Sequence, residues 1–193
     1  MLKKRKPILI QFWGGPGAGK SLGAAGLYVY MGVSTNVRGV SLVREFAKKY
    51  AILRDTDALN DQRFITGGQK AALLRYAIEY DFLISDSAIE LGLAYCSNDS
   101  DLGFVKNSIS DIYRNFSVIN VFINRSEDIA FEESGRVHNL KESLELDKQI
   151  KDMAKNSSLE FEASYIEWKP SRDIKGLFEL VEKELNKNKL LEN

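Results

Sequence analysis

The eight residues 14–21 have the types and the spacing that bind phosphate. They read Gly-Gly-Pro-Gly-Ala-Gly-Lys-Ser, which fits the phosphate-loop pattern G-x-x-x-x-G-K-[ST]. The glycines let the backbone turn tightly and aim its N–H groups at phosphate oxygens. Lys20 is placed to reach the β and γ phosphates, and the Ser21 hydroxyl is placed to bind Mg²⁺. We therefore expect a nucleoside triphosphate to bind Gly14, Gly15, Pro16, Gly17, Ala18, Gly19, Lys20 and Ser21.

Two carboxylates follow apolar runs that read as strands. Asp86 comes directly after residues 82–85, where a carboxylate of a phosphate-loop enzyme holds Mg²⁺ directly or through water. The alternative is that Asp86 caps the next helix. Glu45 follows residues 37–43 and could accept a proton from an acceptor hydroxyl. The alternative is that Glu45 is a first-turn acid favoured by the helix dipole.

Two arginines bracket a polar segment after a later apolar run. Arg125 and Arg136 enclose residues 126–135, and we expect a lid over about residues 125–139. Phosphoryl transfer needs positive charge on the moving group, which a mobile lid delivers when it closes. Gly135 has the conformational freedom of a hinge. The alternative is that both arginines pair with nearby acids on the surface.

Gln69 and Arg75 lie in the helical pattern before the third apolar run. The Gln69 amide could hydrogen-bond a base edge, and Arg75 could meet an acceptor phosphate. Because they are six positions apart, they do not share one stripe of a helix. A solvated helix face explains both residues equally well.

The elements that must position these residues alternate between strands and helices. Apolar runs predict strands at 7–13, 37–43, 82–85, 118–124 and 161–168. Helical patterns cover 21–31, 67–79, 101–115, 140–154 and 174–186. Strands that are apolar throughout and separated by helices predict a parallel sheet covered on both faces. We expect one α/β domain over residues 1–193, a three-layer phosphate-loop NTPase whose ligands bind at the carboxyl ends of the strands.

Composition limits the partners. The 193 residues carry 27 Lys plus Arg and 27 Asp plus Glu, so no overall charge attracts nucleic acid or an anionic membrane. No apolar run approaches the ~18 residues of a membrane helix. Cys96 is the only cysteine, which excludes an internal disulfide and fits a reducing cytoplasm. The basic cluster at residues 3–6 is either a solvated tail or a contact for nucleic acid.

The order of these segments resembles a kinase-like group of phosphate-loop proteins over about residues 7–185. That group includes the ribosylnicotinamide kinase domain of the bacterial NAD-salvage regulator and many small phage proteins. More distantly, the chain resembles the thymidylate and deoxynucleoside kinases. The segments that carry the resemblance are the phosphate loop, Arg44-Glu45-Phe46-Ala47-Lys48, residues 64–75 with Gln69, Ile84-Ser85-Asp86-Ser87, Arg125 and Gly135-Arg136-Val137-His138.

The resemblance implies a five-stranded parallel core that binds ATP with Mg²⁺ and transfers the γ-phosphoryl group to a small hydroxyl or phosphate acceptor. It implies that Glu45 or Asp86 lies near the acceptor and that Arg125 and Arg136 are lid arginines. Related kinases are often dimers, so a homodimer stays open. The sequence departs from the resemblance in two places. The lid carries four acids, and Asp86 is not followed by the arginine of the deoxynucleoside and thymidylate kinases, so their substrates do not carry over.

We therefore expect a cytoplasmic ATP-dependent kinase for a nucleotide, nucleoside or related small acceptor, encoded by a phage and acting in the host cytoplasm. Its expected catalytic residues are Lys20, Glu45, Asp86, Arg125 and Arg136, with Ser21 and Asp86 at the metal and Glu45, Gln69 and Arg75 at the acceptor. One alternative is a kinase for a hydroxymethylated base, such as 5-hydroxymethyluracil, or an end in DNA, which only the cluster at residues 3–6 supports. The other is an ATPase or nucleotide-dependent switch, in which Gln69 or Arg125 would position water.

Overall fold

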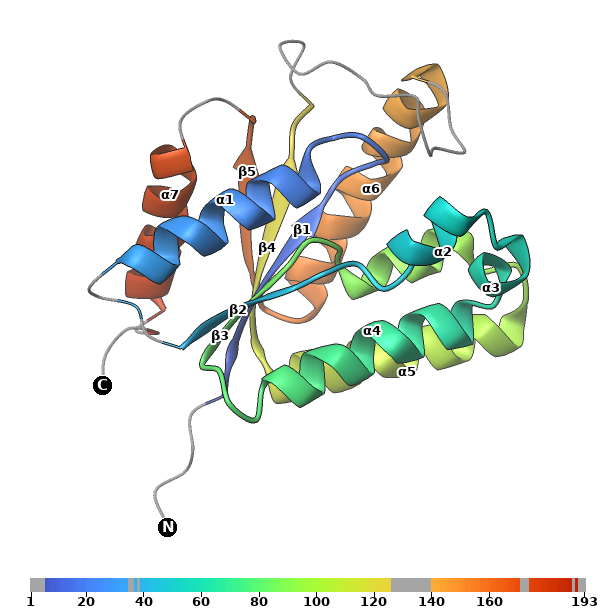
Figure 1. The fold of residues 1–193 in the computed structure, drawn as a ribbon, viewed down its shortest axis with the longest axis horizontal. Helices are drawn as coiled ribbons and strands as arrows, with labels where there is room; N and C mark the ends of the chain where they lie inside the picture. The colour runs from blue at the N-terminus through green and yellow to red at the C-terminus, as the bar shows by residue number, and fades with distance from the viewer. Residues whose placement is uncertain are drawn as a thin grey trace.

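A parallel five-stranded sheet forms the centre of the molecule (Figure 1). The structure is a computed structural model that describes residues 6–34, 37, 39–125, 140–170, 174–188 and 190, with no side chains described for 140–143. The strand order is β2-β3-β1-β4-β5, and every neighbouring pair is parallel. The strands are β1 (Ile8–Trp13), β2 (Val40–Val43), β3 (Phe82–Ser85), β4 (Ser117–Ile123) and β5 (Ser164–Trp168).

Helices cover both faces of this sheet, as the sequence predicts. Alternate residues of β1 point to opposite faces, because side chains alternate along a strand. Ile8, Ile10 and Phe12 join the core beneath α1 and α7, whereas Leu9 and Trp13 face the other layer. The helices on the first face are α1 (Lys20–Val33) and α7 (Ile174–Lys187), and those on the second are α4 (Gln62–Tyr76), α5 (Asp99–Asn115) and α6 (Leu140–Glu160) (Figure 1).

The sheet register brings the carboxyl ends of three adjacent strands together. Ser85 at the end of β3 is level with Gln11 of β1 and with Val43 of β2. The segments that follow these strands are the phosphate loop (residues 14–21), the turn of Arg44 and Glu45, and Asp86. Residues far apart in the sequence therefore meet at one edge of the sheet, where open α/β sheets bind their ligands.

Three short helices were not predicted from the sequence. They are α2 (Lys48–Leu53), α3 (Thr56–Asn60) and η1, a 3-10 helix at Ile89–Tyr95. Each has at most seven residues, which is too short for a helical hydrophobic pattern to stand out. Helix α4 begins at Gln62 rather than at residue 67, because the Asp61 side chain accepts a hydrogen bond from the Phe64 N–H at its start. The second strand is shorter than predicted and begins at Val40.

Candidate active site

The phosphate loop has the backbone shape that its glycines predict. Gly17 and Gly19 adopt φ values of 75° and 97°, which other residues rarely adopt. Helix α1 begins directly after Gly19, and in the described chain no side chain caps its first turn. The N–H groups at that end therefore remain available to an anion, and the helix dipole favours negative charge there.

Lys20 is folded back over the loop that precedes it. Its Nζ donates hydrogen bonds to the carbonyls of Gly14 (2.7 Å) and Gly15 (3.1 Å). Desolvation by burial lowers the pKa of Lys20, and the nearby carboxylates of Glu45, Asp147 and Asp86 partly oppose that shift. Lys20 thus lies among acids at the phosphate loop, in the position expected for a phosphate-binding cation.

Asp86 is almost completely buried at the end of β3, with 1 % of its surface exposed. One carboxylate oxygen, Oδ1, accepts a hydrogen bond from the Glu45 N–H. The other, Oδ2, is buried without a hydrogen bond and lies 3.6 Å from Arg44 Nε. The alternative that Asp86 caps the next helix is wrong, because η1 begins after Ala88 and no side chain caps it.

The residues present fit Mg²⁺. A buried carboxylate oxygen that lacks a hydrogen bond costs free energy unless some group binds it. Asp86 Oδ2 is such an oxygen, and Ser21 is the other predicted ligand. The described residues contain no cluster of three or more His, Cys, Asp or Glu side chains that could hold a metal by themselves. Mg²⁺ is usually held by one or two carboxylates together with substrate phosphates and water, so one carboxylate and one hydroxyl are a sufficient protein contribution.

Glu45 lies in the turn between β2 and α2, beside both Asp86 and Lys20. Burial raises the pKa of Glu45 above its ordinary value, whereas the charges of Lys20 and Lys48 act in the opposite direction. A carboxylate with a raised pKa is a stronger base, so it suits the removal of a proton near neutral pH. Glu45 is not a first-turn acid, because α2 begins three residues later and has no acid in its first turn.

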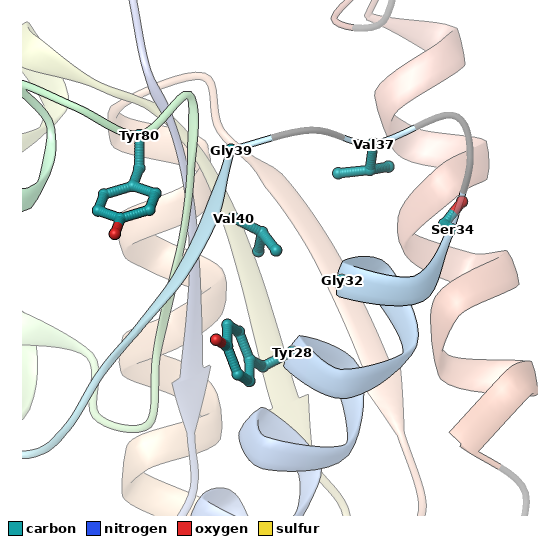
Figure 2. A pocket seen from close by; sticks show the side chains of 7 residues that line it. All are labelled: Tyr28, Gly32, Ser34, Val37, Gly39, Val40 and Tyr80. Atoms are coloured by element: carbon teal, nitrogen blue, oxygen red, sulfur yellow. The ribbon is translucent and has the colours of Figure 1, made fainter.

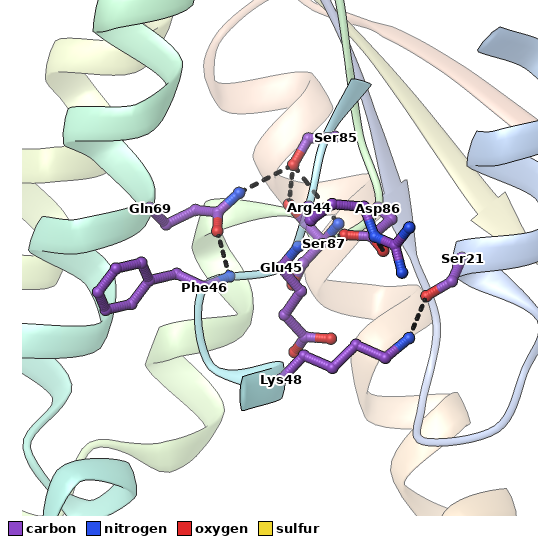
Figure 3. Close-up of polar contacts among 9 residues, drawn as sticks. All are labelled: Ser21, Arg44, Glu45, Phe46, Lys48, Gln69, Ser85, Asp86 and Ser87. Atoms are coloured by element: carbon purple, nitrogen blue, oxygen red, sulfur yellow. Dashed lines mark hydrogen bonds and ion pairs between the residues drawn. The ribbon is translucent and has the colours of Figure 1, made fainter. Parts of the chain in front are cut away.

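Lys48 enters the site although its role was not predicted from the sequence. Figure 3 shows its side chain extending from the start of α2 towards the phosphate loop, where Nζ donates to Ser21 Oγ at 3.2 Å. An ammonium group therefore contacts the hydroxyl expected to bind a metal ion. In the sequence, Lys48 stood out only as the last residue of the segment Arg44-Glu45-Phe46-Ala47-Lys48, with no role of its own.

Gln69 holds two turns of the site together. Its amide oxygen accepts from the Phe46 N–H at 2.8 Å, and its amide nitrogen donates to Ser85 Oγ at 3.1 Å (Figure 3). Only 5 % of its surface is exposed. Both ends of the amide are therefore occupied by protein groups, and the structure gives no support to the predicted contact with a base edge. Gln69 instead positions the turn that carries Glu45.

Arg75 lies away from the groups of the site, so the structure gives no support to the predicted contact with an acceptor phosphate. It lies six residues beyond Gln69, or about 9 Å further along α4 at 1.5 Å per residue. There it lines a hollow with residues that precede β3, at the amino end of a strand whose carboxyl end carries Asp86. Because α4 runs antiparallel to β3, its last turns lie away from the edge of the sheet that carries Asp86.

Arg125 packs against the outside of the phosphate loop. Its Nε donates to Asp147 Oδ2 at 2.9 Å, and its Nη2 donates to the Pro16 carbonyl at 2.9 Å. Asp147 Oδ1 in turn accepts from the Gly15 N–H at 2.7 Å. Arg125 thus pairs with an acid of α6 that no sequence pattern indicated. Arg136, Gly135 and the rest of the predicted lid up to residue 139 lie outside the described residues.

A buried polar cluster surrounds Glu90 of η1, the helix that follows Asp86 in the chain. Glu90 of η1 accepts hydrogen bonds from Gln11 Nε2 at 2.9 Å, from the Tyr113 hydroxyl at 2.5 Å and from Ser157 Oγ at 2.9 Å. Burial raises the pKa of Glu90, and these hydrogen bonds partly oppose that shift. The cluster joins β1, η1, α5 and α6, and η1 begins three residues after Asp86.

A hollow of about 600 Å³ lies elsewhere, between the end of α1 and the start of β2 (Figure 2). The described residues that line it carry no charged side chain: Tyr28, Gly32, Ser34, Val37, Gly39, Val40 and Tyr80. This hollow is at the opposite edge of the sheet from the phosphate loop. It supplies none of the groups that the site described above requires.

Comparisons with solved structures identify the fold. A thymidylate kinase from Ehrlichia chaffeensis matches with a TM-score of 0.60 and 15% identity, over 94% of this chain and 100% of that one. A deoxyadenosine kinase from M. mycoides with bound dATP matches with a TM-score of 0.56 and 16% identity, over 92% of this chain and 99% of that one. Neither a protein-family model nor a curated protein matches the chain.

The chain therefore has the fold of these phosphate-loop kinases, and the predicted distant resemblance to them is confirmed at the level of fold. The closer resemblance to the ribosylnicotinamide kinase group and the phage origin stay predictions. Within the described residues, no helix is both long and apolar enough to cross a membrane.

Proposed function

We propose that the chain is an ATP-dependent phosphotransferase that phosphorylates a hydroxyl group of a nucleoside or a related small acceptor. The observation that carries the proposal is the pair of acids at the carboxyl edge of the sheet. Asp86 Oδ1 accepts a hydrogen bond from the main-chain N–H of Glu45, and both acids lie beside Lys20 of the phosphate loop. The fold shared with a thymidylate kinase and a deoxyadenosine kinase supports a small acceptor of the nucleoside class.

The two acids have different environments and would perform different tasks. Asp86 keeps a buried oxygen without a hydrogen bond, so it would hold Mg²⁺ together with Ser21. Glu45 has its pKa raised by burial, so it would accept the proton of the acceptor hydroxyl. Lys20 and the N–H groups of the loop would bind the phosphates. When bound, ATP supplies the γ-phosphoryl group and Mg²⁺ neutralises part of its charge.

The charges around the acceptor position favour a hydroxyl over a phosphate. An acceptor phosphate is already anionic, so it needs no base and would be repelled by Glu45 and Asp86. Two described cations on that side are engaged by protein groups, because Arg44 lies against Asp86 and Lys48 donates to Ser21. A neutral hydroxyl gains from the same carboxylates, since one of them can remove its proton.

The direct test is turnover by the Lys20→Ala variant. We expect Mg²⁺-dependent loss of ATP when the wild-type protein is incubated with a pool of nucleosides, and a decrease of about 100-fold or more in the variant. Lys183→Ala is the matched control, because Lys183 is an exposed lysine of α7. Both variants should unfold at the temperature of the wild type. Full turnover by Lys20→Ala would contradict the proposal, and ATP loss that needs no acceptor would identify the protein as an ATPase or switch.

A further inference from the structure

The side chains of Asp147 and Arg125 both hydrogen-bond the main chain at the start of the phosphate loop. The Gly15 N–H donates to Asp147, Asp147 accepts from Arg125, and Arg125 donates to the Pro16 carbonyl, at 2.7, 2.9 and 2.9 Å. These three hydrogen bonds close a ring that begins and ends on adjacent residues of the loop. Arg125 follows β4 and Asp147 lies in α6, so the ring connects the phosphate loop to both of these elements.

This ion pair is not an exposed surface contact. The side chains of Arg125 and Asp147 are 14% and 13% exposed, respectively. Hydrogen bonds that involve a charged partner are shorter and stronger than neutral ones, and water screens them less when they are partly buried. Other described ion pairs of α6 are more exposed, with every side chain at least 31% exposed, and they join only side chains. The pair of Arg125 and Asp147 also holds the main chain.

We propose that Asp147 and Arg125 form a clamp that fixes the phosphate loop in its nucleotide-binding shape. The proposal rests on the proposed function only in requiring that the loop binds a nucleotide. A loop that is held in its bound shape loses less conformational freedom on binding, which increases affinity. In this role Asp147 and Arg125 are positioning residues. Arg125 then acts through the Pro16 carbonyl, and not on the transferred phosphoryl group as the sequence led us to expect.

The clamp and a transition-state role for Arg125 predict different results. If Arg125 and Asp147 act as one unit, either substitution breaks the same ring of hydrogen bonds. The double variant should then weaken binding no more than either single variant does. If Arg125 instead stabilises the transition state, Arg125→Ala lowers kcat, and Asp147→Ala releases the arginine without lowering kcat. A double-mutant cycle therefore separates the two roles.

The experiment measures the Kd of Mg²⁺-ATP by calorimetry for Arg125→Ala, Asp147→Ala, the double variant and Asp147→Asn. We expect each single variant and the double variant to raise the Kd by a similar factor of about 10, since hydrogen bonds to charged groups are the strong ones. Asp147→Asn keeps an oxygen that can accept from the Gly15 N–H, so it should restore part of the affinity. Asp152→Ala, an exposed acid of the same helix, is the control and should leave the Kd unchanged.

A second measurement, hydrogen exchange of the Gly15 amide, does not depend on turnover. That amide should be protected in the wild type and should exchange faster in Asp147→Ala, with unchanged exchange in the core of β1. A Kd that stays within twofold of wild type in Asp147→Ala would overturn the clamp, and so would a large loss of kcat confined to Arg125→Ala. If the wild type binds ATP but transfers no phosphoryl group, only the proposed function fails.

Discussion

Glu45 and Asp86 are both carboxylates at the same edge of the sheet, yet their surroundings differ. Asp86 is fixed by the Glu45 N–H and has one buried oxygen without a hydrogen bond, which suits a metal ligand. Glu45 is half-buried among cations and acids, and burial raises its pKa. Different environments for two neighbouring acids are a common way to divide the roles of base and metal ligand.

The proton-accepting role of Glu45 predicts a dependence of rate on pH. The base form is lost as the pH falls through the pKa of Glu45, which lies above the ordinary 4.5. Because the Lys48 charge lowers that pKa, Lys48→Gln should raise it and move the acid limb of the kcat profile to higher pH. Lys49→Gln is the matched control, since the Lys49 ammonium lies over the rings of Phe46 and Tyr50 instead. An unchanged acid limb in Lys48→Gln would show that Glu45 is not the base.

The metal-binding role of Asp86 predicts an altered requirement for Mg²⁺. In Asp86→Asn the side-chain oxygen can still accept from the Glu45 N–H, but the negative charge is lost. The Mg²⁺ concentration that gives half-maximal rate should rise about tenfold or more. Asp81→Asn removes an exposed acid at the amino end of the same strand and should have no effect. Equal Mg²⁺ curves for both variants would exclude Asp86 from the metal site.

The position of Glu45 also depends on how closely α4 approaches the turn after β2. A Cβ added to Gly68 would lie 2.4 Å from two atoms of the Phe46 ring, whereas one added to Gly67 would lie 3.6 Å from Phe104. Gly68→Ala must therefore displace the ring of Phe46, the residue that follows Glu45 in the same turn.

We expect Gly68→Ala to lower kcat and to destabilise the fold by about 1–3 kcal/mol, the usual cost of overpacking. Gly67→Ala should be neutral or stabilising by up to about 1 kcal/mol, because alanine is the better helix former. Urea unfolding and initial rates of the two variants measure the contrast. Equal effects of the neighbouring substitutions would contradict the close packing of α4 on Phe46.

The elements that the sequence predicts well are those with a local pattern. Buried strands are continuous apolar runs, and the phosphate loop has its own glycine spacing, so the sheet and the edge that carries the phosphate loop could be predicted. The contact of Asp147 with Gly15 joins residues 132 positions apart and leaves no local signal. The position of Arg75 was unpredictable for a similar reason, since its distance from the phosphate loop depends on the direction in which α4 runs.

At the scale of the whole molecule, the buried carboxyl of Glu90 predicts a dependence of stability on pH. Its folded pKa lies above the ordinary 4.5, so the native state binds this proton more tightly than the unfolded state does. The carboxyl then lowers stability as the pH rises from about 4.5 through the folded pKa. The unfolding free energy of wild type minus that of Glu90→Gln should therefore decrease over that window.

Glu167 gives the matched control with the opposite sign. Burial raises its pKa, but hydrogen bonds from Lys151, Asn124 and Tyr165 outweigh burial and lower the pKa to about 2. The stability that this acid contributes is present above pH 4.5 and is lost as the pH falls towards 2. The unfolding free energy of wild type minus that of Glu167→Gln should therefore increase as the pH rises. If these two differences changed with pH in the same way, the raised pKa of the buried Glu90 carboxyl would be contradicted.

The phosphorus NMR spectrum of one reaction tests the proposed chemistry most directly. The wild-type protein is incubated with Mg²⁺-ATP and a pool of nucleosides and nucleoside monophosphates, and the new phosphorus resonances are assigned. Transfer to a hydroxyl gives ADP and a new phosphomonoester in equal amounts, and this is the result we predict. New nucleoside diphosphates from the added monophosphates would mean that the acceptor is a phosphate. Inorganic phosphate alone would mean that the acceptor is water, and either result would contradict the role proposed for Glu45.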